Sequence, residues 1–335
     1  MKIAIHHRQS SFSDYWIEYC KANNIDYKIV NAFDNNIIEK IQDCDVFMWH
    51  HHHANFEDTI VAKKILFALE HTGIKVFPDF KTGWHFDDKV AQKYLLESIK
   101  APLVPSYVFY DKKQALEWAK QTDYPKVFKL KGGAGALNVK LVKDFAECKK
   151  FIKAAFGKGF SQFDKINYLK DKGKNFIKGK ESFIAVFKGI YRLFILPEFA
   201  RKQPREINYV YFQEFIPNNF YDTRVVVIGG KVAAAERRFV RKNDFRASGS
   251  GEFSYENIDL EIIKLSFEVA KKLNLQSVAF DFIYDLNQNP LIIEISYGFG
   301  VGGINNVPGY WDDHLNWHED IFNAEEKIII GLINS

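Results

Sequence analysis

The sequence predicts an α/β protein with two or three domains, and three observations lead to this fold class. The chain has 335 residues, which is enough for more than one hydrophobic core. Its residues are 47% hydrophobic and include 31 Phe and 16 Tyr, a composition that excludes a wholly disordered chain. Strand-like and helix-like segments alternate from the first residues onward, as they do in βαβ units.

The first 85 residues are predicted to form a small α/β domain. Strand-like runs at 2–5, 27–30 and 45–49 accompany a helical stretch at 15–22. The run His50–His53 follows the third strand and raises the possibility of a metal site or a tag. Because neighbouring histidines on a strand alternate faces and the run is internal, we expect surface residues there, with substrate contact as the alternative.

A second series of elements starts at Asp87 and Asp88, whose carboxylates suit the first turn of a helix. Pro102 and Pro105 follow this helix and end it. The pattern then changes to strand, helix, strand and glycine-rich loop, and a further helix follows. The predicted ranges are 87–99, 107–110, 112–121, 126–131, 132–135 and 146–156.

Residues 157–205 form a basic segment. They include nine Lys and three Arg against two Asp and two Glu, a net charge of +8, whereas the whole chain carries +4. A helix rich in aromatic and aliphatic residues is predicted at 179–196. We expect a solvated, lid-like insertion, and the alternative is peripheral contact with an anionic membrane surface. No known nucleic-acid-binding motif is present, so nucleic acid is not an expected partner.

From residue 209 the chain is rich in strands, with one clear helix at 260–273 and a hairpin at 277–296. A two-residue loop at Asn287 and Gln288 would place Asp281 directly opposite Glu294. Two carboxylates opposed on a sheet need a cation, and oxygen ligands of this kind suit Mg²⁺. The alternative is a solvated hairpin with two unrelated acids.

Lysines and glycines upstream indicate a phosphate-binding site. Lys129 and Lys131 lie two apart on a predicted strand, hence on one face, and lead into a loop that contains Gly132, Gly133 and Gly135. Backbone N–H groups of such a loop can close over phosphate oxygens, and the lysines can neutralise them. A plain flexible hairpin is the alternative.

Further downstream, the run Y-V-Y-F-Q-E-F-I-P at 209–217 predicts a strand that ends in Gln213 and Glu214. Such an edge can offer backbone hydrogen bonds to an adenine ring, with Phe215 and Ile216 as walls. The arginines of the next hairpin and of the run N-D-F-R suit anion recognition, because Arg presents a fixed fork of donors. They are Arg224, Arg237, Arg238 and Arg246.

The order of these motifs resembles the ATP-grasp superfamily over residues 87–297, and most nearly the RimK-like carboxylate–amine ligases. D-alanine ligase and bacterial glutathione synthetase are more distant. The resemblance implies a pre-ATP-grasp α/β domain at 1–86, a first grasp lobe at 87–208 that contains the basic insertion, and a second grasp lobe at 209–335 with the hairpin and an aromatic carboxy-terminal segment.

The resemblance also implies roles for individual residues. Lys89 and Lys129 would contact ATP phosphates together with Lys131 and the glycine loop, and Gln213 to Ile216 would hold adenine. Asp281 and Glu294 would bind Mg²⁺, while Arg238 and Arg246, with Arg224, would face the transferred phosphate and the acyl group. The chain has Ser296 where the family usually has a metal-binding Asn, so both a site with one Mg²⁺ ion and a site with two are alternatives. It also has Ser248 where the family has Asn after D-F-R.

The implied activity is an ATP-dependent ligation of a small-molecule carboxylate to an amine through an acyl phosphate. The alternatives are a small-molecule phosphotransferase and a non-catalytic nucleotide-binding regulator. The carboxy-terminal segment also resembles uncharacterised ATP-grasp proteins of polysaccharide biosynthesis clusters, which implies a sugar as one substrate. Either a sugar site or a packed capping segment would use the aromatic and polar residues there, namely Tyr310, Trp311, Trp317, Asp312, His314 and His318.

Three features of the chain bear on its location. The amino terminus, M-K-I-A-I-H-H-R, lacks the features of a signal peptide, and no uncharged apolar run reaches the about 18 residues of a spanning helix. Cys20, Cys44 and Cys148 are widely spaced and match no zinc pattern. We therefore expect a cytoplasmic protein whose cysteines are ordinary core thiols.

Overall fold

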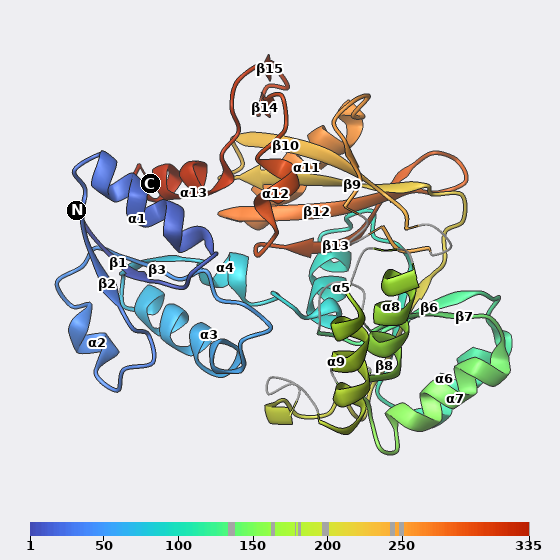
Figure 1. Cartoon of the computed structure of the whole chain (residues 1–335). Coiled ribbons are helices and arrows are strands. Elements are labelled where there is room, and N and C mark those ends of the chain that lie inside the picture. The colour runs from blue at the N-terminus through green and yellow to red at the C-terminus, as the bar shows by residue number, and fades with distance from the viewer. Residues whose placement is uncertain are drawn as a thin grey trace. The chain divides into compact units, whose positions relative to one another are not determined.

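The structure is a computed structural model that describes residues 1–132, 138–161, 165–177, 179, 182–195, 201–241, 245–247 and 251–334, without the side chains of 165–167, 171, 174, 175 and 194. It is a mixed α/β fold, which confirms the predicted class (Figure 1). The chain divides into two compact units. The first comprises 1–86, 94–103 and 216–335, and the second comprises 87–93 and 104–215. The predicted three-domain division stays a prediction.

The amino-terminal part of the first unit is a parallel sheet in the order β2-β1-β3-β4. Alternate residues of its strands enter two different cores: Ile3 and Ile5 pack with Trp16 of α1, whereas Ala4 packs with Leu66 of α3. Helices therefore cover both faces. The strands are β1 Lys2–His6, β2 Asp26–Val30, β3 Val46–Met48 and β4 Lys75–Phe77, and the helices are α1 Phe12–Ala22, α2 Ile37–Lys40, α3 Phe56–His71 and α4 Phe80–Gly83.

The remainder of the first unit is a larger sheet in the order β13-β12-β9-β10-β14-β15, with β11 paired to β10. One face packs on α11, whose predicted range of 260–273 is confirmed. The elements are β9 Tyr221–Ile228, β10 Val232–Phe239, β11 Phe253–Ser254, α11 Leu260–Leu273, β12 Ser277–Tyr284, β13 Pro290–Ser296, α12 Val301–Ile304, β14 Tyr310–Asp312, β15 Trp317–His318 and α13 Ala324–Ile333.

The second unit is built on an antiparallel sheet in the order β5-β8-β6-β7, with α6 and α7 packed together against one hydrophobic core. Asp111 and Asp144 cap these two helices by accepting backbone N–H groups of Gln114 and Glu147. The elements are β5 Ser106–Phe109, α6 Lys112–Gln121, β6 Lys126–Lys129, β7 Val139–Val142, α7 Phe145–Ala155, α8 Lys165–Ile177, α9 Phe183–Phe194 and β8 Val210–Glu214.

Helix α5 runs from Lys89 to Ser98 and is divided between the two units. Asp88 precedes it, and Oδ1 of this residue accepts the N–H groups of Val90 and Ala91 at 3.1 and 3.0 Å. The predicted acidic start of the helix is therefore its amino-terminal cap. All three cysteines are buried and unpaired, as expected of core thiols. None of the helices within the described residues is long and apolar enough to cross a membrane.

Candidate active site

The β12–β13 hairpin brings Asp281 and Glu294 opposite each other, as predicted, but through a different turn. The predicted two-residue loop at Asn287 and Gln288 is wrong, because Tyr284 pairs with Pro290. Asp285 accepts the N–H groups of Asn287 and Asn289, both at 2.8 Å, and Gln288 takes a left-handed backbone with φ +64°. The Asp285 N–H also donates to the Asn289 carbonyl oxygen at 3.0 Å, which closes a three-residue loop of Leu286, Asn287 and Gln288.

That loop alone would place Asp281 opposite the apolar residue Ile293. A bulge between Asp281 and Phe282 shifts the register by one residue and sets Glu294 there instead. Since a shift of one residue moves a side chain to the other face of a sheet, the bulge decides that the two carboxylates share a face.

Four charged side chains form a row across this face of the sheet. In the strand register, Glu236 lies opposite Arg224, Arg224 opposite Asp281, and Asp281 opposite Glu294. Asp222 and Arg238 lie opposite each other one step along the same face. Toward the other end of these strands the face is apolar, and Val226, Ile228, Ala234 and Ala279 enter a buried core. The charged rows therefore begin where the hydrophobic packing ends.

Two arginines hold the Asp281 carboxylate. Arg224 donates from Nε and Nη2 at 2.8 and 3.0 Å, and Arg238 Nη2 lies 2.8 Å from Oδ2. Arg238 also makes a two-pronged ion pair with Asp222 at 2.6 and 2.7 Å. Burial works to raise the pKa of Asp281, but the two guanidinium groups outweigh it and hold that pKa well below its usual range.

The carboxylate oxygens of Asp281 and Glu294 fit a metal site with two protein ligands. A carboxylate has about four acceptor positions, and the two arginines occupy three of those of Asp281, so within the described residues one position on Oδ1 is left. Glu294 lies directly across the strands. Mg²⁺ is commonly held by one or two carboxylates, water and phosphate. Within the described ranges, no group of three or more His, Cys, Asp and Glu side chains could hold a metal ion. Ser296 Oγ donates to the Gly298 carbonyl oxygen at 3.0 Å.

Glu236 and Asp222 are site residues that the sequence reasoning missed. Glu236 is 2% exposed, and its Oε2 has no hydrogen-bond partner within the described part of the chain. Burial, with the nearby carboxylates of Asp281 and Asp222, raises its pKa to about 6, although the two arginines oppose this. The signal was present in the alternation D-T-R and E-R-R, because a strand period of two puts Asp222 with Arg224 and Glu236 with Arg238.

In the second unit, Lys129 and Gln213 form a buried polar cluster. Lys129 Nζ donates to Gln213 Oε1 at 2.6 Å, and Gln213 Nε2 donates to Ser106 Oγ at 3.1 Å. The Tyr211 hydroxyl donates to the same Ser106 oxygen at 2.9 Å. On the other face of this sheet, Lys126 forms an ion pair with Glu214 at 2.8 Å. Two lysine ammonium groups are thus held in the interior of one small sheet.

The strand that carries Gln213 and Glu214 is not a sheet edge. β8 lies between β5 and β6, and the Glu214 N–H donates to the Pro105 carbonyl oxygen at 2.9 Å. The prediction of free backbone groups along this strand is therefore wrong, because both sides are paired. The chain leaves the sheet only at Phe215 and Ile216, where adenine contact stays a prediction.

Lys131 lies beyond the strand on which it was predicted, because β6 ends at Lys129. Its carbonyl oxygen accepts the Lys89 N–H at 2.9 Å, which ties the start of α5 to the end of β6. Its N–H donates to the Tyr209 hydroxyl, and that hydroxyl donates to Glu206. Gly132 is buried. Gly133 and Gly135 lie outside the described residues, as does Ser248.

Of the remaining predicted residues, Arg246 accepts the Arg241 N–H at its carbonyl oxygen at 3.0 Å. Arg237 lies on the face opposite to that of Arg238, with its guanidinium 4.5 Å from the centre of the Tyr221 ring. Arg224 and Arg238 meet at Asp281, whereas Arg237 lies on the other face, so the four predicted arginines do not all share one face of the sheet.

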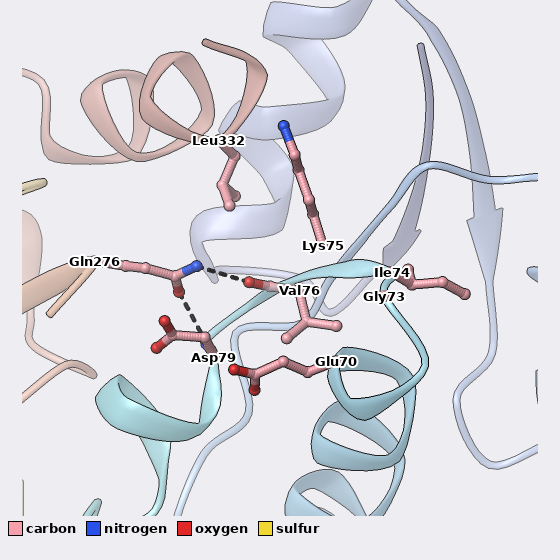
Figure 2. A pocket seen from close by; sticks show the side chains of 8 residues that line it. All are labelled: Glu70, Gly73, Ile74, Lys75, Val76, Asp79, Gln276 and Leu332. Carbon is pink, nitrogen blue, oxygen red and sulfur yellow. Dashed lines mark hydrogen bonds between the residues drawn. The ribbon is translucent and has the colours of Figure 1, made fainter. Parts of the chain in front are cut away.

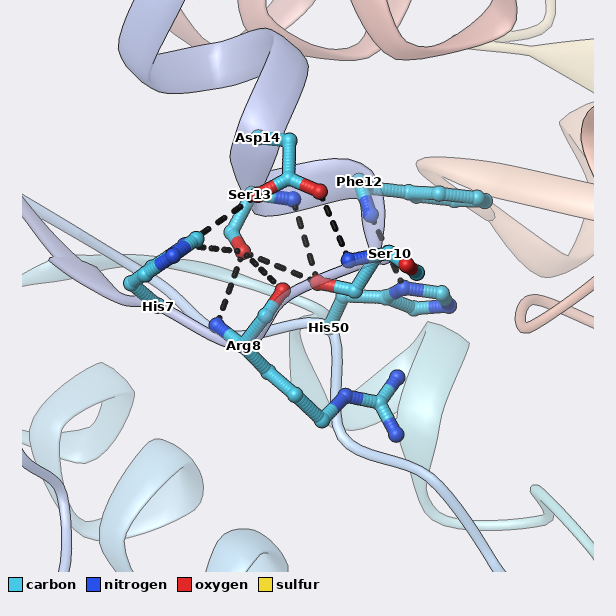
Figure 3. Close-up of polar contacts among 8 residues, drawn as sticks. His7, Arg8, Ser10, Phe12, Ser13, Asp14 and His50 are labelled. Atoms are coloured by element: carbon cyan, nitrogen blue, oxygen red, sulfur yellow. Dashed lines mark hydrogen bonds and ion pairs between the residues drawn. The ribbon is translucent and has the colours of Figure 1, made fainter.

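The histidine run is largely buried, which corrects the expectation of surface residues. The His50 ring stacks on Phe12 with a centroid distance of 3.7 Å, and its Nδ1 accepts the Phe12 N–H (Figure 3). Burial lowers the pKa of His50 to about 3. The His51 ring lies among Phe86 and Tyr297, with centroid distances of 5.2 and 5.0 Å. This cover comes from Phe12, Phe86 and Tyr297, which are distant from the histidine run in sequence, so local sequence did not reveal it.

The carboxy-terminal aromatic residues mostly pack on one another. Trp311 contacts Trp317 at a centroid distance of 4.6 Å, and Tyr310 stacks on His318 at 5.1 Å. Asp312 accepts hydrogen bonds from His314 N, Asn316 N and Asn316 Nδ2, and its Oδ2 lies 3.0 Å from His318 Nε2, so it holds the β14–β15 turn. This packing favours the capping interpretation. A separate cavity of about 240 Å³ lies at Glu70, Asp79 and Gln276 and contains none of the predicted site residues (Figure 2).

Two segments of the chain match family models. Residues 203–310 match the RimK-like ATP-grasp domain, and residues 88–181 match the ATP-binding domain of the carbamoyl-phosphate synthase L chain. The chain is 22% identical over 246 residues to alpha-aminoadipate–LysW ligase LysX of Saccharolobus solfataricus, which covers 73% of this chain and 70% of that protein.

Solved structures are similar over almost the whole length. D-cycloserine synthetase DcsG superposes with a TM-score of 0.61 and 11% identity, covering 100% of this chain and 99% of that one. D-alanine–D-alanine ligase from Bacillus anthracis, complexed with ATP, has a TM-score of 0.58 and 13% identity, covering 100% and 96%. The chain therefore has the fold of ATP-grasp ligase structures, and its residues 203–310 are similar to the RimK-like ATP-grasp domain.

Proposed function

We propose that this protein is an ATP-dependent carboxylate–amine ligase. The observation that carries the proposal is the row of Arg224, Asp281 and Glu294 on one sheet face, reinforced by Arg238. With a divalent cation bound to the carboxylates, the row would combine that ion with fixed guanidinium donors, which suits phosphoryl transfer to an anionic acceptor. The ligase names of LysX and of D-alanine–D-alanine ligase support the same class.

The reaction would have two steps. A substrate carboxylate oxygen attacks the γ-phosphorus of ATP, the bond to ADP breaks, and an acyl phosphate forms. An amine then attacks the acyl carbon, loses a proton and expels inorganic phosphate, which leaves an amide. The products are the amide, ADP, phosphate and a proton.

The proposed roles of the individual residues follow the order of the motifs along the chain. Lys89 and Lys129 would neutralise phosphate charge, with Lys131 and the glycines at 132, 133 and 135, and the segment from Gln213 to Ile216 would hold adenine. Arg224 and Arg238 orient Asp281, and Arg238 with Arg246 would face the transferred phosphate. Asp281 and Glu294 would hold Mg²⁺, with Ser296 as a further candidate ligand. When bound, the ion supplies charge neutralisation on the phosphate oxygens.

The proposed substrates are a small carboxylate and a small amine. Both fit the reaction, and a sugar acid or amino sugar of a surface polysaccharide is the finer proposal. The packing of Tyr310 and Trp311 leaves Trp317, which is 45% exposed, as the aromatic side chain of that segment most open to a sugar ring. The proposed reaction would take place in the cytoplasm.

Trapping of the acyl phosphate tests the proposal. Purified protein with Mg²⁺, ATP and a panel of carboxylates, including uronic and amino acids, should form a hydroxamate when hydroxylamine replaces the amine, with one ADP per hydroxamate. Asp281→Asn and Glu294→Gln should lower this rate about a hundredfold or more, because several kcal/mol of charge stabilisation is lost. Glu268→Gln, at an exposed carboxylate of α11, is the matched control.

Failure of every carboxylate to yield hydroxamate, with ATP bound normally, would count against the ligase proposal. A stable phosphorylated product without amide would instead identify a phosphotransferase. Unchanged rates in both carboxylate variants would point to a site elsewhere.

A further inference from the structure

The helical hairpin of α8 and α9 leaves one apolar surface exposed. The two helices pack together, and Gly189 lies so close to α8 that an added Cβ would be 2.8 Å from Leu169 Cδ1. The side of α9 that carries Gly189 therefore packs against α8. The other side carries large exposed side chains, which with Phe176 of α8 form what we call the α9 surface: Phe176, Phe183, Ile184, Phe187, Ile190 and Tyr191.

The α9 surface is a continuous stripe. Its residues on α9 recur at spacings of three and four, so they lie on one side of the helix. Phe183, Ile184 and Phe187 are 58%, 67% and 57% exposed. Phe183 contacts Phe187 and Phe176 with ring centroids 4.9 and 5.6 Å apart, so the rings form one cluster. Contiguous exposed apolar groups of this kind mark interaction sites.

The segment that carries the stripe is basic. Residues 165–195 include seven Lys and one Arg against one Asp and one Glu, a net charge of +6. On α9 itself, Lys188 and Arg192 follow Ile184 at steps of four residues and so border the stripe on one side. The Arg192 guanidinium lies 5.8 Å from the centre of the Tyr191 ring.

The apolar and basic side chains together indicate which partner fits the α9 surface. An amphipathic helix with aromatic and aliphatic residues on one side and cations beside them suits a surface of anionic lipid, where apolar side chains enter the headgroup boundary. In a symmetric contact with a second copy of this chain, two segments that each carry a net charge of +6 would face each other and repel.

We propose that the α9 surface attaches this protein peripherally to anionic membranes. The apolar stripe enters the interface, and Lys188 and Arg192 contact lipid phosphates. The attachment does not depend on the ligase activity, so either one can fail without the other.

Vesicle flotation of the full chain tests the proposal. Vesicles of phosphatidylcholine alone are compared with vesicles in which about a third of the lipid is phosphatidylglycerol, at about 0.15 M salt. The protein should float with the anionic vesicles and not with the neutral ones, and about 0.5 M salt should weaken binding. No flotation with the anionic vesicles would overturn the proposal.

Two variants separate the contributions. Ile184→Gln/Phe187→Gln should lower the partition coefficient at least about tenfold through lost apolar contact. Lys188→Gln/Arg192→Gln should lower it about fivefold for each charge removed. Leu286→Gln/Ile321→Gln, at exposed apolar residues of the first unit, is the matched control and should bind as the wild type does. Circular dichroism and melting temperature check folding of each variant.

Binding that is unchanged in both α9 variants would contradict the proposal. So would a concentration-dependent dimer, measured without lipid, that Ile184→Gln/Phe187→Gln dissolves, since this would assign the surface to a second copy. Anionic binding that survives the apolar variant but is lost in the charge variant would reduce the site to non-specific attraction and would also overturn it.

Discussion

Glu236→Gln offers a direct test of how the charged face is held together. Glu236 is buried, and burial with two neighbouring carboxylates raises its pKa from 4.5 to about 6. Between these two pH values the folded chain binds more of a proton at this residue than the unfolded chain does. The free energy of unfolding therefore falls as the pH rises through this window, and the loss is complete above pH 6.

The magnitude follows from the two pKa values. Since one pKa unit corresponds to about 1.4 kcal/mol, ionised Glu236 lowers the free energy of unfolding by about 2 kcal/mol near pH 8 and by almost nothing near pH 4. Gln cannot ionise. Relative to the wild type, Glu236→Gln should therefore be about 2 kcal/mol more stable at pH 8 than it is at pH 4.

Urea denaturation of both proteins at the two pH values, followed by tryptophan fluorescence, measures this difference. Glu268→Gln, which removes an exposed carboxylate, should show no such change between the two pH values. An unchanged or reversed difference for Glu236→Gln would refute the reasoning, because it would mean that Arg224 and Arg238 keep Glu236 ionised at no cost to the fold.

The same charged face and the lysine cluster of the second unit lead to three further expectations. Arg238→Met should lower the free energy of unfolding by about 3 to 5 kcal/mol, because Asp222 and Asp281 lose a shared buried cation. Urea denaturation measures this change, and a decrease of less than about 1 kcal/mol would contradict the network. Gly303→Ala should lower the melting temperature, because its Cβ would lie 1.9 Å from Glu236 Oε2. The same substitution in a Glu236→Ala background should lower the melting temperature much less. An equal decrease in both backgrounds would mean that the clash lies elsewhere. Lys129→Met should weaken ATP binding at least about tenfold in isothermal titration calorimetry, whereas Lys153→Met, on exposed helix surface, should not; equal affinities would remove Lys129 from the site.

Local sequence was sufficient for most elements of the fold. The α11 range and the acidic start of α5 were predicted because apolar periodicity and capping acids act within a few residues of each other. The pairing of Asp281 with Glu294 was also correct, but two local errors cancelled in it. The loop holds three residues instead of two, and a bulge restores the register, and neither leaves a clear signal in the residues themselves.

Contacts between distant segments produced the remaining corrections. β8 is a central strand because β5 and β6, far earlier in the chain, pair with its two sides, so its backbone groups are occupied. His50 and His51 are buried by rings that include Phe12 and Tyr297, which come from opposite ends of the chain. Burial of this kind depends on packing that no window of the sequence contains.

The sequence by itself determined the α/β class and several of the elements, and it indicated the residue types of a phosphate- and cation-binding site, because periodicity, caps and side-chain chemistry are local properties. Only the tertiary structure decided which charges meet. Asp222, Arg224, Glu236 and Asp281 come from three strands, and hydrogen-bond register between those strands, not spacing along the chain, joins them into one network. The same holds for the α9 surface, where packing against α8 decided which side of an apolar helix stays exposed.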